Sequence, residues 1–320
     1  SSLLHLIRHP GQYDLIYVSS PPISAAITGA MFSRLSGIPW VLEVRDLWPD
    51  AGLGSGIFRP DTLFYRLSKG LECWLYKSAS LTVLVTEAAE EIVRQTQPES
   101  NTCVVHNGAD ERHFRPDKPV TAPPEELKKT PGTFRVGYVG SIGIIHDFEA
   151  VVKAAVACQQ DSDIEFVIVG DGSQRHKLKA LIEQYQPRNL RWIGLRPHEH
   201  IPDYINTFDV GLNPVRKVKA FESIVTVKFY EYLACSVPVI TLGSGTLAEI
   251  GARSKAAITL PPGDAPGLAE TIQQLKADPE RLNTLRKAAR PFVEQHFSRR
   301  KLSDQLIAQL EKLMAEESKT

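Results

Sequence analysis

Three groups of residues in the sequence have the types and spacing that chemistry at a sugar or a phosphate needs. The first is Lys228 and Glu231, within the run Lys-Phe-Tyr-Glu-Tyr-Leu-Ala. Residues three positions apart share one face of a helix. A carboxylate there can hold two ribose hydroxyls, while an ammonium and the N–H groups of a helix start bind phosphate. The pair therefore predicts a sugar-diphosphate site, with a surface ion pair as the alternative.

The second group is a glycine-rich loop, Gly140-Ser141-Ile142-Gly143, ahead of a helix expected to start near Asp147. Glycines before a helix start let the backbone approach a phosphate closely, and the helix dipole favours negative charge. The loop lacks the full Gly-x-Gly-x-x-Gly fingerprint of dinucleotide-binding proteins. A phosphate-binding loop and a simple tight turn both fit this pattern, and the same holds for Gly170-Asp171-Gly172.

The third group is a cluster of charges that closes an apolar run: Glu43, Arg45 and Asp46, followed by Leu-Trp-Pro-Asp. Charged side chains at the carboxyl end of a strand lose part of their hydration. This loss costs free energy unless the charges pair with one another or bind a ligand. We therefore regard these three as candidate catalytic residues. Structural pairing of Arg45 with one of the carboxylates is the alternative.

Short β-rich runs alternate with helical patterns along the chain, which is typical of parallel sheets with crossover helices. In such sheets ligands bind beyond the carboxyl ends of the strands, where the three groups stand. The predicted strands are residues 15–18, 40–44, 81–85, 103–106, 135–139, 164–169, 190–193, 210–212, 237–242 and 256–260.

The predicted helices are residues 23–37, 62–77, 87–95, 148–158, 173–185, 200–207, 228–235 and 246–252. From Ala265 onward the pattern is almost entirely helical. Proline lacks the N–H that a helix interior needs, so Pro279 and Pro291 are expected to break this tail into pieces. Ser298 is a candidate N-cap for the last piece.

The alternating elements form two sets, which predicts two Rossmann-like domains at residues 1–108 and 134–297. Residues 109–133 contain five prolines among charged residues and are predicted to be a linker. Residues 298–320 form the last helix. The first set has only four strands, which would leave a sheet edge and apolar faces uncovered. We therefore expect N-terminal strands to be missing from this chain or supplied from outside it.

The composition favours an ordinary globular protein and gives no sign of a nucleic-acid partner. The 320 residues include 42% hydrophobic and 23% charged residues, and 37 basic residues balance 37 acidic ones. Binding to a phosphate backbone usually needs a basic excess. No apolar run approaches the roughly 18 residues that a membrane-spanning helix needs.

Metal-binding patterns are weak in this sequence. Cys73, Cys103, Cys158 and Cys235 are far apart and are predicted to be reduced thiols in a cytosolic protein. Asp161-Ser162-Asp163 precedes a strand instead of following one, so a solvated turn explains it. His198-Glu199-His200 has no apparent third ligand and is predicted to be a surface turn. We expect no metal site and no cofactor.

Several runs together resemble the group 1 (family four) retaining glycosyltransferases. Residues 13–22 and 40–49 resemble the first domain of that family, and His-Asn-Gly-Ala-Asp at 106–110 followed by Phe-Arg-Pro at 114–116 resembles its passage into the linker. Val-Ile-Val-Gly-Asp-Gly at 167–172 and Glu-Tyr-Leu-Ala-Cys-Ser-Val-Pro-Val-Ile at 231–240 resemble its donor domain. The order and spacing of these runs cover essentially the whole chain. The most similar branch makes bacterial O-antigen, capsule or exopolysaccharide.

The resemblance implies an α/β fold of the GT-B class, in which two Rossmann-like doubly wound domains face a cleft. The first domain would bind the acceptor and the second a UDP- or GDP-linked sugar, and the last helix would return to the first domain. The implied enzyme is a metal-independent hexosyltransferase that acts on a saccharide, in particular a lipid-linked one. It would work in the cytoplasm at the inner face of the membrane, with peripheral membrane contact.

The resemblance also implies roles for single residues. Glu231 corresponds to the second glutamate of the family's Glu-x7-Glu motif, which grips the ribose. The first glutamate falls on Ser223, and Glu222 could substitute for it through a one-residue bulge. The backbone at Thr226, Val227 and Lys228 would approach the donor phosphates or sugar.

Two departures from the family pattern concern charge. Ser141 and His146 stand where many relatives carry an Arg and a Lys for the diphosphate, so neutralisation would rest on the backbone of Gly140–Gly143 and on Lys228. The family's His-Asp after an acceptor-domain strand is here Arg45-Asp46. Asp46 would orient acceptor or donor, and Arg45 would face developing charge.

Two other readings remain open at this point. A GT-B epimerase would isomerise or hydrolyse a nucleotide sugar without a second acceptor. A non-catalytic donor-binding subunit would need a partner chain to complete the first domain. An NAD-dependent oxidoreductase is a weaker alternative, because neither strand–loop junction has the dinucleotide fingerprint followed by a ribose carboxylate.

Overall fold

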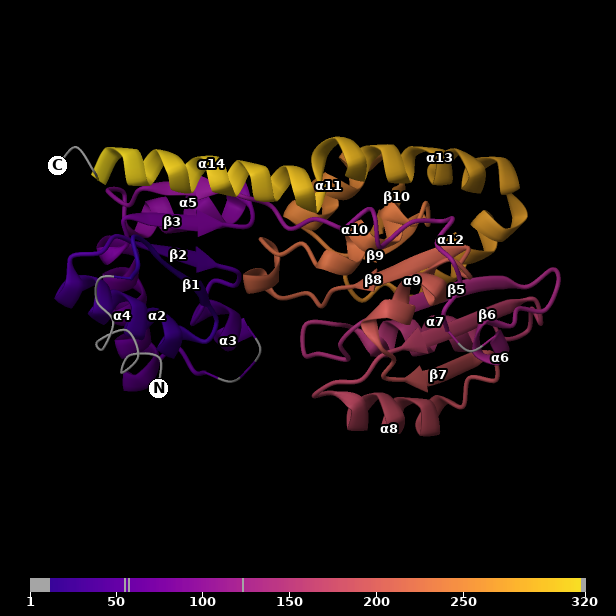
Figure 1. Ribbon diagram of the computed structural model, residues 1–320. Helices are drawn as coiled ribbons and strands as arrows, with labels where there is room; N and C mark the ends of the chain where they lie inside the picture. The colour runs from indigo at the N-terminus through magenta and orange to yellow at the C-terminus, as the bar shows by residue number, and fades with distance from the viewer. Residues whose placement is uncertain (1–11, 55, 57, 123, 318–320) are drawn as a thin grey trace. The chain divides into compact units, whose positions relative to one another are not determined.

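The computed structural model describes residues 12–54, 56, 58–122 and 124–317, and the chain divides into two compact units (Figure 1). The first unit runs to His106 and also contains the chain from Arg300 onward, while the second is Asn107–Arg299. Each unit is an α/β structure around a parallel sheet. This architecture is the α/β class with two doubly wound domains that the strand–helix alternation predicts.

The first unit contains a four-stranded parallel sheet in the order β1-β2-β3-β4 among the described residues. Each strand lies within two residues of its predicted bounds. The strands are β1 (Ile16–Ser20), β2 (Trp40–Val44), β3 (Leu81–Leu84) and β4 (Thr102–Val104). The helices described in this unit are α2 (Ile23–Ser36), α3 (Asp50–Gly54), α4 (Leu63–Ser78), α5 (Glu87–Thr96) and nearly all of α14 (Arg299–Glu317).

Both faces of the first sheet are covered by helices. Trp40 and Leu42 point to one face, where they join a core with Phe32 of α2. Val41 points to the other face, where it joins Leu313 of α14. Side chains alternate between the faces of a strand, so the apolar run of β2 serves both layers.

The second unit contains a six-stranded parallel sheet in the order β10-β9-β8-β5-β6-β7. All six predicted strands are confirmed within two residues at each end. They are β5 (Phe134–Val139), β6 (Ile164–Val169), β7 (Leu190–Gly194), β8 (Val210–Pro214), β9 (Val239–Leu242) and β10 (Ala257–Leu260).

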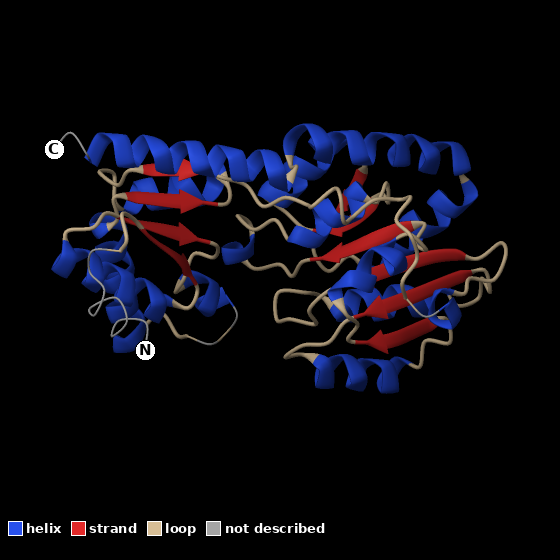
Figure 2. Cartoon of the chain, viewed as in Figure 1, coloured by secondary structure: helices blue, strands red, loops and turns tan. Residues whose placement is uncertain are grey.

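Helices alternate with these strands (Figure 2). They are α6 (Pro124–Leu127), α7 (Phe148–Cys158), α8 (Arg175–Tyr185), α9 (Ile201–Ile205), α10 (Val227–Ala234), α11 (Thr246–Ser254), α12 (Ala265–Ala277) and α13 (Pro279–His296). Two short 3-10 turns, His198–His200 and Lys219–Phe221, complete the set. Asp147 caps α7 as its side chain accepts the N–H of Ala150, which fits a helix start at this point.

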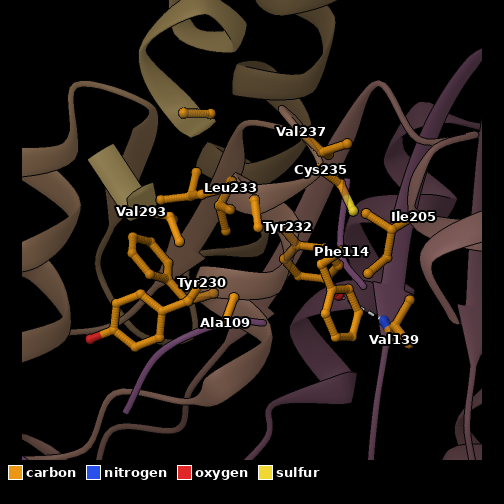
Figure 3. Close-up of a cluster of buried hydrophobic side chains, with 14 of the residues drawn as sticks. Ala109, Phe114, Val139, Ile205, Tyr230, Tyr232, Leu233, Cys235, Val237 and Val293 are labelled. Carbon is orange, nitrogen blue, oxygen red and sulfur yellow. Dashed lines mark hydrogen bonds between the residues drawn. The ribbon is translucent and has the colours of Figure 1, made fainter. Parts of the chain in front are cut away.

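One core of the second unit anchors helix α10 against the end of β5 (Figure 3). Tyr232 and Leu233 of α10 are buried beside Val139, the last residue of β5. The Val139 N–H donates a hydrogen bond of 2.7 Å to the Tyr232 hydroxyl. Because a buried hydroxyl and N–H must find partners, this bond fixes the register of the helix on the strand end.

The proline-rich residues 109–133, predicted as a linker, lie within the second unit. Ala109, Phe114 and Ala122 are buried in the same core as α10. The buried Asp203 carboxylate accepts hydrogen bonds from the N–H groups of Thr121 and Ala122. This segment is therefore held by packing and by a buried polar network.

The prediction that Pro291 breaks the C-terminal helical tail is wrong. Helix α13 runs from Pro279 to His296 with Pro291 inside it. Ala289, Phe292 and Val293 on either side of the proline are buried in the core of the second unit. Tertiary packing of this turn outweighs the lost backbone hydrogen bond. The break at Pro279 is confirmed, since α12 ends at Ala277.

Among the described residues, none of the helices has both the length and the apolar character needed to cross a membrane.

Candidate functional site

The topology of the second sheet singles out one place for a ligand. The chain builds β5, β6 and β7 outward in one direction and then returns to place β8 on the other side of β5. Ligands of doubly wound sheets bind where the strand order reverses, beyond the carboxyl ends of the strands. The loops after β5 and β8 flank this switch point, and they carry the predicted donor-binding residues.

A pocket of about 480 Å³ lies at this switch point, within the second unit. Six of the eight predicted donor-binding residues line it: Gly140, Ser141, Thr226, Val227, Lys228 and Glu231. The first two follow β5, and the others lie at the start of α10. Gly140 and Glu231, which are 91 positions apart in the sequence, therefore line the same cavity.

The structure does not place Gly143 and Glu222 in the lining of this pocket. The Gly143 carbonyl accepts the N–H of His146 and closes a tight turn. The Glu222 side chain is exposed, and its carbonyl accepts the N–H of Thr246 at the start of α11. The pocket lining thus lacks the glutamate suggested as a substitute for the first one of Glu-x7-Glu.

Sequence reasoning missed the side of the pocket that follows β7. Leu195, Arg196 and His198 line the pocket there. His198 is exposed in a short 3-10 turn, as the prediction of a surface turn for His198–His200 expects. Arg196 is held by Glu126 through two hydrogen bonds of 2.7 and 2.8 Å. The rule that ligands meet the carboxyl ends of strands could have identified this loop, because it directly follows a predicted strand.

Two glycines allow the loops after β5 and β6 to touch. A Cβ on Gly170 would lie 1.9 Å from the Gly140 carbonyl oxygen, and both residues have a positive φ, +142° and +132°. Only glycine adopts this conformation without strain. The Tyr138 hydroxyl donates a 2.6 Å hydrogen bond to the Ser141 carbonyl. The backbone that faces the pocket is thereby fixed in a single path.

The Glu231 carboxylate lines the pocket. None of the described residues forms a hydrogen bond or an ion pair with it. Burial raises the pKa of this carboxyl to about 6, against the opposing charges of Arg299 and Lys228. A carboxylate that is partly desolvated and free to accept hydrogen bonds suits a pair of ligand hydroxyls.

Lys228 is buried, so the alternative of a surface ion pair with Glu231 is wrong. Its Nζ lies 2.7 Å from Nε2 of His146 and 3.1 Å from the Tyr138 hydroxyl. It also lies 4.6 Å from the centroid of the Tyr138 ring. Burial lowers the pKa of Lys228 to about 7, with Glu231 opposing the shift.

The start of α10 offers further donors for an anion. Thr226 precedes the helix without capping it through its side chain, because its hydroxyl donates to Oδ1 of Asn213 at 2.9 Å. Helix starts leave N–H groups unpaired and carry a partial positive charge. Together with Lys228 and the Gly140–Ser141 backbone, they form a pocket wall suited to a diphosphate.

The predicted catalytic residues Glu43, Arg45 and Asp46 lie at the carboxyl end of β2 in the first unit. Among the described residues, none of them forms an ion pair within 4 Å, so the alternative of structural pairing finds no support there. Burial raises the pKa of Asp46, and the charge of Arg45 opposes this. Half-buried Glu43 and exposed Arg45 complete the cluster.

Comparisons with known proteins match both units. The family model described as "Glycosyl transferases group 1" matches residues 121–292, and a "Glycosyl transferase 4-like domain" matches residues 1–108.

Three individual proteins illustrate the likeness. A crystal structure of Anabaena HepE in complex with UDP superposes with a TM-score of 0.78, at 19% identity over 97% of this chain and 82% of that chain. The 2-deoxystreptamine glucosyltransferase of Streptomyces kanamyceticus is 25% identical over 97% of this chain and 80% of its own length. Escherichia coli K12 WcaL, named for a role in colanic acid biosynthesis, is 25% identical over 75% of this chain and 58% of its own length.

Proposed function

Because this chain belongs to the group 1 glycosyl transferases, with the family match spanning residues 121–292, we propose that it moves a hexose from a nucleoside-diphosphate sugar to a saccharide acceptor. The observation that carries the proposal is the pocket at the switch point of the second sheet. It combines a carboxylate free to accept hydroxyls, an uncapped helix start and a lysine. These are the groups that ribose and diphosphate need.

The proposed donor lies with its ribose on Glu231 and its diphosphate against the backbone of Gly140, Ser141, Thr226 and Val227. We place the nucleobase against Leu195 and Arg196, which also line the pocket. We infer a uridine nucleotide, which the UDP complex of the structurally similar HepE supports.

Charge develops on the leaving nucleoside diphosphate as the glycosidic bond breaks. N–H groups already aimed at the phosphates and the Lys228 ammonium stabilise that charge without reorganisation. This set supplies the electrostatic role that a metal plays in other enzymes, so we propose transfer without a metal ion. We further propose retention of the anomeric configuration by front-face attack, with the departing phosphate taking the acceptor proton.

The proposed acceptor-side residues are Asp46, Arg45 and Glu43 in the first unit. Asp46 orients the acceptor hydroxyl, and Arg45 faces the charge that develops on the leaving group. The raised pKa of Asp46 fits a carboxyl held in a partly dehydrated site.

We propose a lipid-linked saccharide as acceptor, in the assembly of a cell-surface polysaccharide at the inner face of the membrane. The likeness to WcaL supports a polysaccharide, whereas the likeness to the 2-deoxystreptamine enzyme names a small aminocyclitol as the competing acceptor class. Leu63, Phe64 and Leu67 of α4 are exposed beside Arg66. Apolar side chains interleaved with a cation suit a peripheral contact with anionic lipid.

Calorimetric titration with UDP, GDP, UDP-glucose and NAD tests the donor site. We expect binding of UDP and its sugars, weaker binding of GDP and none of NAD. Failure of every nucleoside diphosphate to bind a folded sample would overturn the proposal. Donor binding without transfer to any lipid-linked saccharide or aminocyclitol would instead support the donor-binding subunit.

A further inference from the structure

Lys228 lines the donor pocket, yet none of the described residues provides a counterion in contact with its ammonium. Among the described residues, Nζ lies within hydrogen-bond distance of the imidazole of His146 at 2.7 Å and of the hydroxyl of Tyr138 at 3.1 Å. Both are neutral acceptors. An unpaired charge that is buried among neutral groups is expensive, so the protonated form of this lysine is poorly stabilised while the pocket is empty.

The elements packed around Lys228 each present identifiable groups. Strand β5 contributes Tyr138, and the loop after it contributes His146. Helix α10 contributes Glu231, which also feels the positive charge of Arg299. It contributes Tyr232 as well, whose hydroxyl accepts a hydrogen bond from the Val139 N–H. Glu231 is thus the one carboxylate among these groups, and it acts on Lys228 from a distance beyond an ion pair.

His146 is held as a neutral acceptor. Its ring is buried, and its Nδ1 has no hydrogen-bond partner among the described residues. A second positive charge 2.7 Å from the lysine would be strongly unfavourable, and burial together with Lys228 lowers the pKa of His146 to about 2. The tautomer with its proton on Nδ1 leaves Nε2 to accept from the lysine.

We propose that His146 is a positioning residue for Lys228, and that this pair takes up one proton when the diphosphate of a nucleotide sugar enters the pocket. The proposal rests on the proposed function, since it takes the ligand of this pocket to be a nucleoside-diphosphate sugar. The anion supplies the counterion that the empty pocket lacks. The lysine then holds its full positive charge when the leaving diphosphate needs it.

The sign of the pH dependence follows from linkage. In the free protein the pKa of Lys228 is about 7, and a bound anion raises it. Affinity therefore falls by up to about tenfold per pH unit as the pH rises above 7, until the pKa of the complex is reached. Glu231, with a pKa of about 6, must be ionised to hold the ribose. Affinity thus also falls below pH 6, and it is highest between these values.

Titration calorimetry of the whole chain with UDP-glucose, in buffers of different ionisation enthalpy, measures the proton uptake directly. The diphosphate of UDP-glucose is esterified at both ends and does not titrate near neutrality, unlike that of UDP. With a pKa of about 7 for Lys228 and about 6 for Glu231, we expect roughly 0.9 proton taken up per donor bound at pH 8. At pH 6 Lys228 is already charged and Glu231 must lose about half a proton to bind the ribose, so we expect a net release of about 0.4 proton.

Three variants separate the role of His146 from a general effect on folding. K228M should bind UDP-glucose weakly and without proton uptake. H146Q keeps a neutral acceptor and should retain both the uptake and the pH profile. H146L removes the acceptor, so the pH at which affinity begins to fall should move down by about 1 unit. The thermal midpoint of each variant checks that it is folded.

Each outcome is decisive. Binding of UDP-glucose by the unaltered chain without proton uptake at pH 8 overturns this inference and leaves the proposed function standing. Unchanged uptake in K228M, or an unchanged pH profile in H146L, also overturns it. Failure of UDP-glucose, UDP and GDP to bind at all overturns the proposed function itself.

Discussion

At the scale of single residues, the donor pocket depends on groups whose ionisation is set by burial. Glu231 and Lys228 share one face of α10, as their spacing predicts, but they do not neutralise each other in an ion pair. Each keeps its hydrogen-bonding capacity for something else. Lys228 directs its ammonium to His146 and Tyr138, and Glu231 keeps its carboxylate for the pocket.

Replacing Glu231 with Gln should weaken UDP binding by about 10- to 100-fold, because two hydrogen bonds to an ionised acceptor become weaker ones to a neutral amide. Titration calorimetry measures the change. Glu249 of α11 is exposed and does not line the pocket, so E249Q is the matched control and should bind normally. Equal affinity of E231Q and the unaltered chain would remove Glu231 from the ribose site.

Replacing Asp46 with Asn should lower the rate of sugar transfer by about 100-fold and leave the affinity for UDP unchanged, because the proposed role of Asp46 lies with the acceptor. Transfer of radiolabelled sugar, together with calorimetry, separates these two effects. D61N alters an exposed carboxylate of the same unit and serves as the control. A normal transfer rate in D46N would show that this carboxylate has no part in the reaction.

At the scale of elements, the pocket is built by the start of α10 and by three loops, which follow β5, β6 and β7. Gly170 lets the loop after β6 lie directly on Gly140. Tyr232 holds α10 against the end of β5, because its hydroxyl accepts a hydrogen bond from the Val139 N–H. The site is thus placed by rigid packing of regular elements and not by long flexible loops, which keeps the N–H groups aimed before the donor arrives.

Substituting Gly170 with Ala should lower the free energy of unfolding by at least about 3 kcal/mol, since the new Cβ meets a carbonyl oxygen and φ is positive. Denaturant unfolding followed by circular dichroism measures this change. Gly70 of α4 offers the contrast, because a methyl group added there would meet nothing within 4 Å and its φ is an ordinary helical one. G70A should stabilise the chain by roughly 0.5–1 kcal/mol. Equal effects of the two substitutions would contradict the packing argument.

The exposed apolar side chains of α4 make a separate prediction. The chain should co-sediment with vesicles that contain anionic lipid, and F64S should reduce the bound fraction several-fold, because it removes an exposed aromatic ring that would insert into the lipid. M31S alters an exposed apolar residue of α2 and serves as a comparison. Equal binding of neutral and anionic vesicles would contradict the role of anionic lipid, and binding to neither would remove the membrane from the proposal.

At the scale of the whole molecule, the first unit needs both ends of the chain. The segment up to His106 supplies the sheet, and the chain from Arg300 onward supplies α14. Leu313 lies in one buried cluster with Val41, Leu81 and Val83. Helix α14 therefore stabilises β2 and β3, which precede it by more than 200 residues. Because the second unit lies between them in the sequence, the first unit can be completed only after the second has been synthesised.

Replacing Leu313 with Ala should destabilise the first unit by about 2–5 kcal/mol, because the substitution leaves a cavity under the helix. Ile307 lies on the same helix with half of its surface exposed, and I307A should change stability by no more than about 0.5 kcal/mol. Hydrogen exchange resolved by mass spectrometry should show the loss in β2 and β3 and not in β5 or β8. A loss spread evenly over both units would contradict independent units.

Much of the architecture could be predicted from the sequence, because the alternation of β-branched runs and helical patterns is local. All ten described strands and the loop–strand junctions follow from it. Pro291 shows where local reasoning fails: propensity predicts a break, but Ala289, Phe292 and Val293 are buried on either side and hold the helix together. The segment 109–133 has the composition of a linker, yet Phe114 is fully buried.

The sequence by itself determined which residues could bind a donor, since Glu231, Lys228 and the Gly140–Ser141 loop are recognisable by type, spacing and position after a strand. Only the tertiary structure decided what those residues do there. Lys228 meets His146 across 82 positions of sequence, and no local pattern encodes that contact. Burial beside neutral partners turns an ordinary lysine into one whose charge depends on its ligand. The cause is dehydration, which acts only once the fold has removed water from the site.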